Sequence, residues 1–177
     1  MNIQDIQPSL RQKVSELDSL AEQVEIWKAE GLSIGFTNGV FDIVHIGHVN
    51  YLEEAASHVD RLIIGLNSDA SVRRLGKGPE RPINSEEARA IVLAGLSSVA
   101  AICTFEEDTP LKLIERLIPD ILMKGGDYNI AISDPEDKAY IVGSREVKSM
   151  GGKVLSIPFV QGFSTTDIVK KLRKNGD

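Results

Sequence analysis

The sequence predicts an α/β fold, an open and doubly wound sheet of five parallel strands with helices on both faces, preceded by an N-terminal helix. Short segments rich in Val, Ile and Leu alternate along the chain with longer segments of helical period. Several of the short segments are apolar at consecutive positions, which is typical of strands covered on both faces. Strands that alternate with helices connect through right-handed crossovers and therefore run parallel. In such a sheet, ligands bind beyond the carboxyl ends of the strands.

The composition is that of a globular chain with one substantial core. The chain has 177 residues, of which 42% are hydrophobic and 26% are charged. It contains no apolar run of the roughly 18 residues that a membrane span needs, and no charged and then apolar leader segment. The single cysteine, Cys103, allows neither an internal disulfide nor a thiolate metal cluster, and suits a reducing compartment. A net charge of -6 gives no overall basic footprint. We therefore expect a cytoplasmic protein that binds neither nucleic acid nor membrane.

The N-terminal part of the chain carries one amphipathic stripe. Its apolar residues recur three and four positions apart and are Leu10, Val14, Leu17, Leu20, Val24 and Trp27. This spacing predicts a helix over residues 10–27. We treat residues 1–30 as a helical extension and residues 31–177 as the main domain. The stripe is compatible with packing on the core, covering a sheet edge or meeting a partner subunit, and the pattern does not choose among them.

The remaining elements follow in alternation. Strands are expected at residues 32–37, 61–67, 99–105, 120–124 and 153–158, which read LSIGFT, RLIIGLN, VAAICTF, DILMK and KVLSIP. Helices are expected at residues 47–58, 85–96, 109–118, 137–149 and 165–173. Ser85 followed by Glu86, and Thr109 followed by Pro110, are typical helix starts. Residues 75–84 and 125–136 contain Gly, Pro, Asp and Asn and are expected to form loops at strand ends, where such a fold holds its functional residues.

The most informative segment is TNGVFDIVHIGH, residues 37–48, which follows the first strand and begins a helix. A helix start exposes unpaired N–H groups and the positive end of the helix dipole, which together favour phosphate. His45 and His48 lie three positions apart and can reach one bound group, while Gly47 lets the backbone come close to it. Imidazoles donate hydrogen bonds to phosphate oxygens and stabilise charge that develops during a displacement.

Other interpretations of the two histidines are weaker. A zinc site lacks a nearby cysteine and an HExxH pattern, so no metal ligands are expected here. One capping and one core-packed histidine stay possible from the spacing alone. The dinucleotide pattern GxGxxG is absent after the first strand and GxxxxGK[ST] is absent throughout, which argues against hydride transfer and P-loop hydrolysis.

Residues 37–48 resemble the T-x-G-x-F-D-x-x-H-x-G-H signature of the cytidylyltransferase-like nucleotidyltransferases. Within that superfamily, NSDASVRRL, FEEDTP, KGGDY and GFSTTDIVKKL are most similar to the heptose 1-phosphate adenylyltransferases. The resemblance implies a Rossmann-like fold and transfer of AMP from ATP, with Mg²⁺, to D-glycero-β-D-manno-heptose 1-phosphate. The products would be ADP-heptose and pyrophosphate, formed by in-line attack without a covalent intermediate. The alternative is a CTP-dependent enzyme acting on an alcohol phosphate such as glycerol 3-phosphate. It is weakened because residues 159–161 are Phe-Val-Gln, where the glycerol-phosphate enzymes carry an arginine.

The resemblance also implies site residues. The implied catalytic residues are His45, His48, Lys77 and Arg89. The implied nucleotide-binding residues are Thr37, Asn38, Gly39, Phe41, Asp42, Gly47, Lys124, Asp127, Ser164, Thr165 and Thr166.

Simpler roles stay open for several of these residues. The hydroxyls at positions 164–166 also suit a helix N-cap, and Arg89 alone suits a surface salt bridge. Lys77 suits a solvated loop, and Asp42 and Asp127 suit turns. Residues 128–140 form an acidic stretch longer than the family pattern. A homodimer is expected from the resemblance and from the stripe at residues 10–27.

Overall fold

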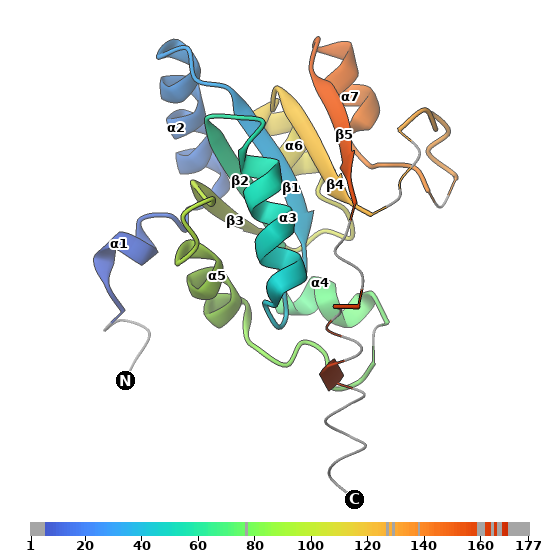
Figure 1. The fold of residues 1–177 in the computed structure, drawn as a ribbon. Helices are drawn as coiled ribbons and strands as arrows, with labels where there is room; N and C mark the ends of the chain where they lie inside the picture. The colour runs from blue at the N-terminus through green and yellow to red at the C-terminus, as the bar shows by residue number, and fades with distance from the viewer. Residues whose placement is uncertain are drawn as a thin grey trace, which may run out of the picture.

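The fold is one parallel sheet with helices on both sides (Figure 1). The computed structural model describes residues 6–76, 78–126, 128, 130–137, 139–158, 162, 163, 165, 168 and 169. The strands are β1 (Ile34–Gly39), β2 (Arg61–Asn67), β3 (Ala101–Phe105), β4 (Ile121–Gly125) and β5 (Lys153–Ile157). They pair in the order β3-β2-β1-β4-β5, and every pair is parallel. The predicted doubly wound α/β fold is therefore confirmed.

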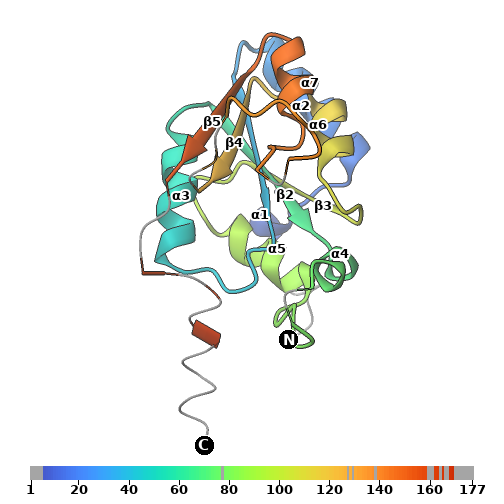
Figure 2. The same cartoon turned by 90° about the vertical axis from the view of Figure 1, so that its right-hand side faces the viewer.

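The helices form two layers. They are α1 (Pro8–Arg11), α2 (Leu17–Ala29), α3 (Ile46–Ala56), α4 (Asp69–Arg74), α5 (Glu86–Ala94), α6 (Leu111–Leu117) and α7 (Ser144–Ser149). Helix α6 contacts both α2 and α7 on one face of the sheet, whereas α3 and α5 contact β2 from the other face (Figure 2). Both faces are thus covered, as the consecutive apolar residues of the strands predict.

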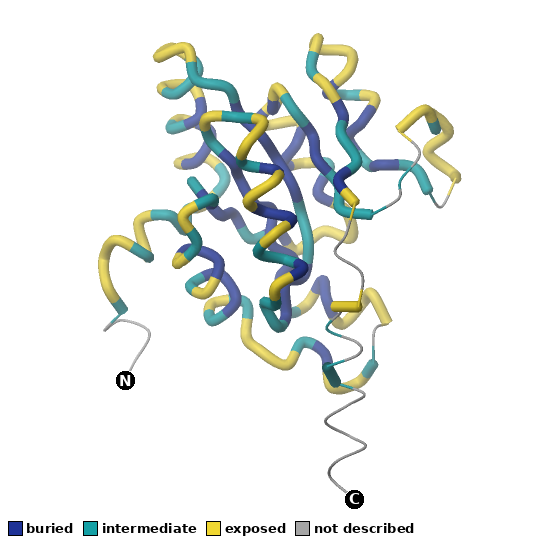
Figure 3. Tube along the Cα trace, viewed as in Figure 1, coloured by how far each residue is buried: buried dark blue, intermediate teal, exposed yellow. Residues whose placement is uncertain are grey.

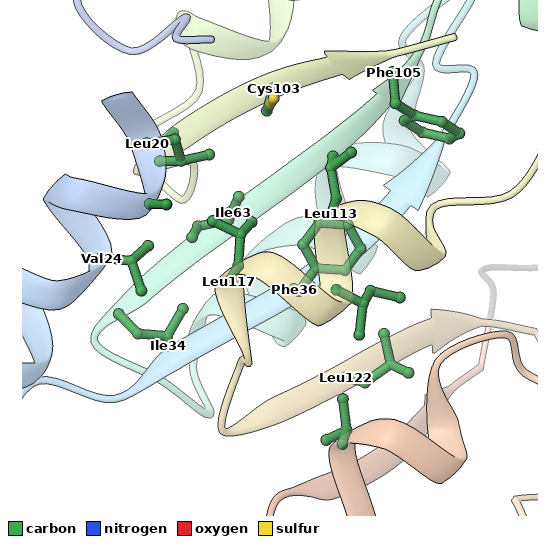
Figure 4. Packing of buried hydrophobic residues seen from close by; sticks show 14 of the residues in the cluster. Leu20, Val24, Ile34, Phe36, Ile63, Cys103, Phe105, Leu113, Leu117 and Leu122 are labelled. Carbon is green, nitrogen blue, oxygen red and sulfur yellow. The ribbon is translucent and has the colours of Figure 1, made fainter. Parts of the chain in front are cut away.

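Each face has its own core because side chains alternate along a strand. Ile63 of β2 packs with Leu20, Phe36 and Leu113 under α2 and α6 (Figure 4). Its neighbours in β2 pack on the opposite side with Leu52 of α3 and Leu93 of α5. Figure 3 shows the resulting buried stretches along the central strands.

The prediction of a single helix over residues 10–27 is wrong. Helix α1 ends at Arg11, Val14 forms a parallel bridge with Ile102 of β3, and α2 begins only at Leu17. Leu10 and Val14 pack in the core under α3 and α5, while Leu17 and Leu20 pack in the core under α2 and α6. One straight helix cannot reach both faces, so the chain rounds the edge of the sheet at β3. The apolar stripe thus fills two of the three roles that the sequence left open. It packs in the core, and it covers the edge strand β3.

Smaller differences have local causes. Helix α4 was not expected; Ser68 caps it, accepting a hydrogen bond from the Ser71 backbone N–H at 3.1 Å. Helix α7 begins at Ser144 instead of residue 137, because Asp134 and Asp137 bind nearby backbone N–H groups in turns. Ser85 does cap α5, whereas Thr109 caps nothing and α6 begins at Leu111. The helix expected at residues 165–173 lies largely outside the described residues.

Candidate active site

A cleft opens where β1 and β4 separate. The two strands pair only at Gly35↔Ile121 and Phe36↔Leu122, although β1 continues to Gly39 and β4 to Gly125. From β1 the chain continues to β2 on one side of the gap, and from β4 it continues to β5 on the other side, so this is the switch point at which doubly wound sheets bind ligands. The cavity has a volume of about 590 Å³. It is lined by Asn38, Gly39, Val40, Phe41, Asp42, His45, His48, Tyr51, Arg81, Lys124, Gly125, Tyr128, Phe163 and Thr165.

The two histidines form a stacked pair at the start of α3. His45 is the N-cap residue, and its Nδ1 accepts a hydrogen bond from the Gly47 backbone N–H at 3.1 Å. The neutral ring therefore carries its proton on Nε2 and can donate it to a ligand. The ring centroids of His45 and His48 are 3.9 Å apart with an interplanar angle of 22°. A Cβ on residue 47 would lie 3.1 Å from the His45 ring, which explains the glycine between them.

Burial keeps both imidazoles uncharged. It lowers the pKa of His45, and together with the neighbouring His45 ring it lowers the pKa of His48 to about 4. The backbone of Ile43 acts in the opposite direction on His48. Phe41 packs against His48 edge to face, with centroids 5.1 Å apart. At pH 7 both rings are thus neutral, and His45 offers its Nε2–H to the cavity as a hydrogen-bond donor.

Lys124 lies between two lobes of the cleft. Its Nζ donates to Asn38 Oδ1 at 3.1 Å. Both residues line the main cavity and also a second cavity of about 290 Å³. The second lobe is lined further by Asn67, Asp108, Thr109 and Tyr140, among other residues. An ammonium group shared by two adjoining pockets can contact one phosphate from each of two ligands.

Asp42 anchors the histidine loop to the loop before α5. Its carboxylate is fully buried and accepts hydrogen bonds from Arg81 Nε, from the Ile83 backbone N–H at 2.8 Å and from the Asn84 backbone N–H at 3.0 Å. Asp42 reaches the cavity lining, but its oxygens already have protein partners. Asp42 therefore does more than form the turn that the sequence left open as its role. It links its own loop to a loop 41 positions further along the chain.

Three predicted site residues, Thr37, Gly47 and Arg89, are not among the residues that line the main cavity. Arg89 is buried, and its guanidinium donates to Asn84 O at 3.1 Å, Val40 O at 2.7 Å and Asp69 Oδ1 at 2.8 Å. The surface salt bridge considered for Arg89 is wrong, because its side chain is 0% exposed. Thr37 is also buried and shares a 2.7 Å hydrogen bond with the hydroxyl of Tyr51, whose pKa burial raises to about 12.

The C-terminal segment reaches the same site in part. Thr165 lines the main cavity, and its hydroxyl donates to Ile43 O at 3.5 Å. Phe163 lines the cavity beside it. The predicted residues Lys77, Asp127, Ser164 and Thr166 lie outside the described residues.

Sequence reasoning did not assign site roles to Arg81, Tyr51, Tyr128 or Phe163, although all four line the main cavity. Only Arg81 carried a usable signal, because it is a cation in a Gly- and Pro-containing loop between a strand and a helix. The three aromatic residues look like ordinary core or loop positions in the sequence.

The described residues contain neither a ready metal site nor a membrane-spanning helix. No group of three or more His, Cys, Asp and Glu side chains is placed to hold a metal ion. None of the described helices combines the length and apolar character needed to cross a membrane.

Comparisons with known proteins agree with this geometry. The bifunctional protein HldE of Mesorhizobium japonicum is 54% identical over 160 residues, which cover 90% of this chain and 30% of that protein. HldE of Hyphomonas neptunium is 51% identical over 155 residues, covering 88% of this chain and again 30% of the relative. The chain therefore spans less than a third of the length of these curated relatives.

Solved structures share the fold. The lipopolysaccharide core biosynthesis protein of Thermoplasma volcanium matches 73% of this chain and 98% of its own, with a TM-score of 0.57 and 27% identity. A pantoate–β-alanine ligase of Francisella tularensis, solved in complex with beta-gamma ATP and β-alanine, covers 90% of this chain and 76% of its own. Its TM-score of 0.52 and 14% identity show the fold alone. The family model described as cytidylyltransferase-like matches residues 36–171, which include the cleft and both histidines, and the chain belongs to that family.

Proposed function

We propose that the protein is an adenylyltransferase that moves AMP from ATP to D-glycero-β-D-manno-heptose 1-phosphate, giving ADP-heptose and pyrophosphate. The observation that carries the proposal is the stacked pair of neutral histidines at the start of α3, in one cavity with Lys124. The motifs shared with heptose 1-phosphate adenylyltransferases and the similarity to bifunctional HldE proteins support the choice of substrate. A role in lipopolysaccharide biosynthesis follows from this substrate.

The reaction needs positioning and charge stabilisation more than covalent help. An oxygen of the sugar phosphate attacks the α-phosphorus, a new P–O bond forms, and the bond to the β-phosphate oxygen breaks as pyrophosphate leaves. His45 Nε2–H donates to the phosphate oxygens that gain charge, and the positive end of the α3 dipole stabilises them. Lys124 contacts the α-phosphate because it lies between the two lobes. The second lobe then holds the acceptor.

Mg²⁺ enters this proposal as part of the nucleotide substrate. Enzymes of this kind that act on ATP generally use Mg²⁺, and Mg²⁺ in proteins is commonly bound through substrate phosphates. The described residues offer no ready group of three ligands, and the Asp42 carboxylate already has protein partners. The fit therefore favours MgATP over a resident ion.

We also propose a cytoplasmic homodimer, and a division of the chain into an extension at residues 1–30 and a nucleotidyltransferase domain at residues 31–177. The assignments of Lys77, Asp127, Ser164 and Thr166 to the nucleotide and of Arg89 to catalysis stay predictions. Arg89 would act through Val40 and Asp69, which its guanidinium holds.

A coupled assay of pyrophosphate release tests the function. ATP and CTP are each supplied with heptose 1-phosphate and with glycerol 3-phosphate, and we expect turnover with ATP and the heptose phosphate. In the same assay His45→Ala and His48→Ala should each lower kcat on the order of 10²–10³-fold, because each removes a donor to the transition state. His58→Ala is the matched control, since His58 lies beyond the far end of α3 and should leave kcat unchanged.

Two outcomes would contradict the proposal. Turnover with CTP and glycerol 3-phosphate alone would favour the alternative enzyme. Parent-like turnover in both histidine variants, with weaker nucleotide binding, would mean that the histidines only bind.

A further inference from the structure

We propose that Arg81 is a further catalytic residue, which binds the β- and γ-phosphates of the nucleotide, and that Asp42 is the residue that positions it. The inference rests on the proposed function, and neither role follows from the sequence motifs. Arg81 lines the main cavity together with His45 and His48, although its side chain is only 8% exposed.

The Arg81 guanidinium is held at one nitrogen only. Nε donates to Asp42 Oδ2, and within the described residues the side chain makes no other hydrogen bond. The terminal nitrogens are not fully enclosed by protein atoms, and the Arg81 side chain lines the main cavity. A guanidinium carries five N–H donors, of which four lie on these two terminal nitrogens.

A purely structural arginine would use its donors inside the protein. Arg89 does so, because its Nε, Nη1 and Nη2 each donate to a protein oxygen. Burying a charged group is unfavourable unless its donors find partners. The difference between Arg81 and Arg89 is explained if the partners of Arg81 arrive with a ligand. Two parallel N–H donors on a rigid fork match two oxygens of a phosphate group.

Asp42 fixes the direction in which the fork points. Its carboxylate is 0% exposed and is itself held by the backbone N–H groups of Ile83 and Asn84. The Asn84 side chain also donates to Asp42 O at 2.7 Å. Because the carboxylate cannot move, its bond to Nε sets the plane of the Arg81 guanidinium.

The position of Arg81 in the cleft indicates which of the two substrates it contacts. It lines the lobe that contains the histidines, the start of α3 and Thr165, and not the second lobe around Asn67 and Thr109. It therefore contacts the triphosphate tail instead of the phosphate of the acceptor. Loss of Arg81 should raise KM for ATP and lower kcat, while KM for the sugar phosphate stays unchanged.

Calorimetric titration with inorganic pyrophosphate and Mg²⁺ tests this role without the acceptor. Arg81→Gln should bind pyrophosphate about 10- to 100-fold more weakly, as expected for the loss of hydrogen bonds between charged groups. Arg116→Gln is the matched control, because it removes the same charge from an exposed site on α6 outside the cavity lining. It should bind pyrophosphate like the parent.

A double-mutant cycle tests the positioning role. Asp42→Asn keeps an oxygen for the loop N–H groups but loses the ion pair, so it should also weaken pyrophosphate binding. Arg81→Gln with Asp42→Asn should bind no more weakly than Arg81→Gln alone, because Asp42 acts through Arg81. A merely structural Asp42 would lower the melting temperature and give additive effects on affinity.

Parent-like pyrophosphate affinity in folded Arg81→Gln, or additive losses in the double variant, would overturn the proposal. If Arg81→Gln does not fold, Arg81→Lys keeps the charge beside Asp42 but lacks the fork, and parent-like affinity there overturns the bidentate contact. A chain that transfers AMP to no sugar phosphate would contradict the proposed function, yet the pyrophosphate titration would still decide the role of Arg81.

Discussion

His48 has surroundings that disfavour its charged form, and this has a consequence for stability. Its pKa is about 4 in the folded protein and near 6.5 in an unfolded chain. As the pH falls below 6.5 the unfolded state takes up a proton that the folded state refuses until about pH 4. The free energy of unfolding therefore decreases through this window, and the decrease is complete below it.

We expect His48→Gln to be less sensitive to acid than the parent, because it lacks this group. Thermal melts of both proteins at pH 7, 6 and 5 measure the effect. His58→Gln, which removes an exposed histidine beside Glu54, serves as the control. Equal losses of melting temperature in the parent and in His48→Gln would show that the ring is not held neutral by burial.

Among single residues, the sequence predicts those whose chemistry is local. His45, His48 and Lys124 were expected at a helix start and a strand end, and all three line the cavity. Tyr51 could not be assigned in this way, because its place in the site depends on packing of α3 against the sheet, and the orientation of Arg81 depends on its hydrogen bond to Asp42. Such long-range pairings leave no spacing in the sequence.

At the scale of elements, apolar patterns predict which segments are buried better than they predict where a helix ends or is interrupted. The strand expected at residues 61–67 coincides with β2, since RLIIGLN is buried from its second residue onward. The stripe at residues 10–27 was also buried, but on two faces of the sheet instead of along one helix. The six-residue helix α4 is too short for its period to stand out.

Helix α2 should contribute to stability through its inner face. Leu20 is 1% exposed in the core, so Leu20→Ala should lower the free energy of unfolding by about 2–5 kcal/mol. Ile26 lies on the same helix but is 53% exposed, and Ile26→Ala should change it by less than about 1 kcal/mol. Urea denaturation of the two variants gives both values. Similar losses in both would contradict the docking of α2 on the sheet.

At the scale of the whole molecule, the use of α2 for the core weakens one reason for expecting a dimer. Leu20, Ala21 and Val24 are already buried within one chain. The proposed homodimer then depends on the family resemblance and on other surfaces. Light scattering at micromolar concentration should give about twice the chain mass of 19.3 kDa. A mass near that of one chain would remove the dimer from the proposal.

The early end of pairing between β1 and β4 also bears on how the protein meets its ligands. Each strand beside the gap is paired along its length with its other neighbour. Strand β1 pairs with β2 up to Gly39↔Leu66, and β4 pairs with β5 up to Gly125↔Ile157. The spacing of the two strands is therefore fixed by the two outer pairings, while loop residues such as Phe41 and Arg81 complete the lining. A nucleotide would therefore meet two strands that already hold their positions, and little of its binding energy would go into ordering them.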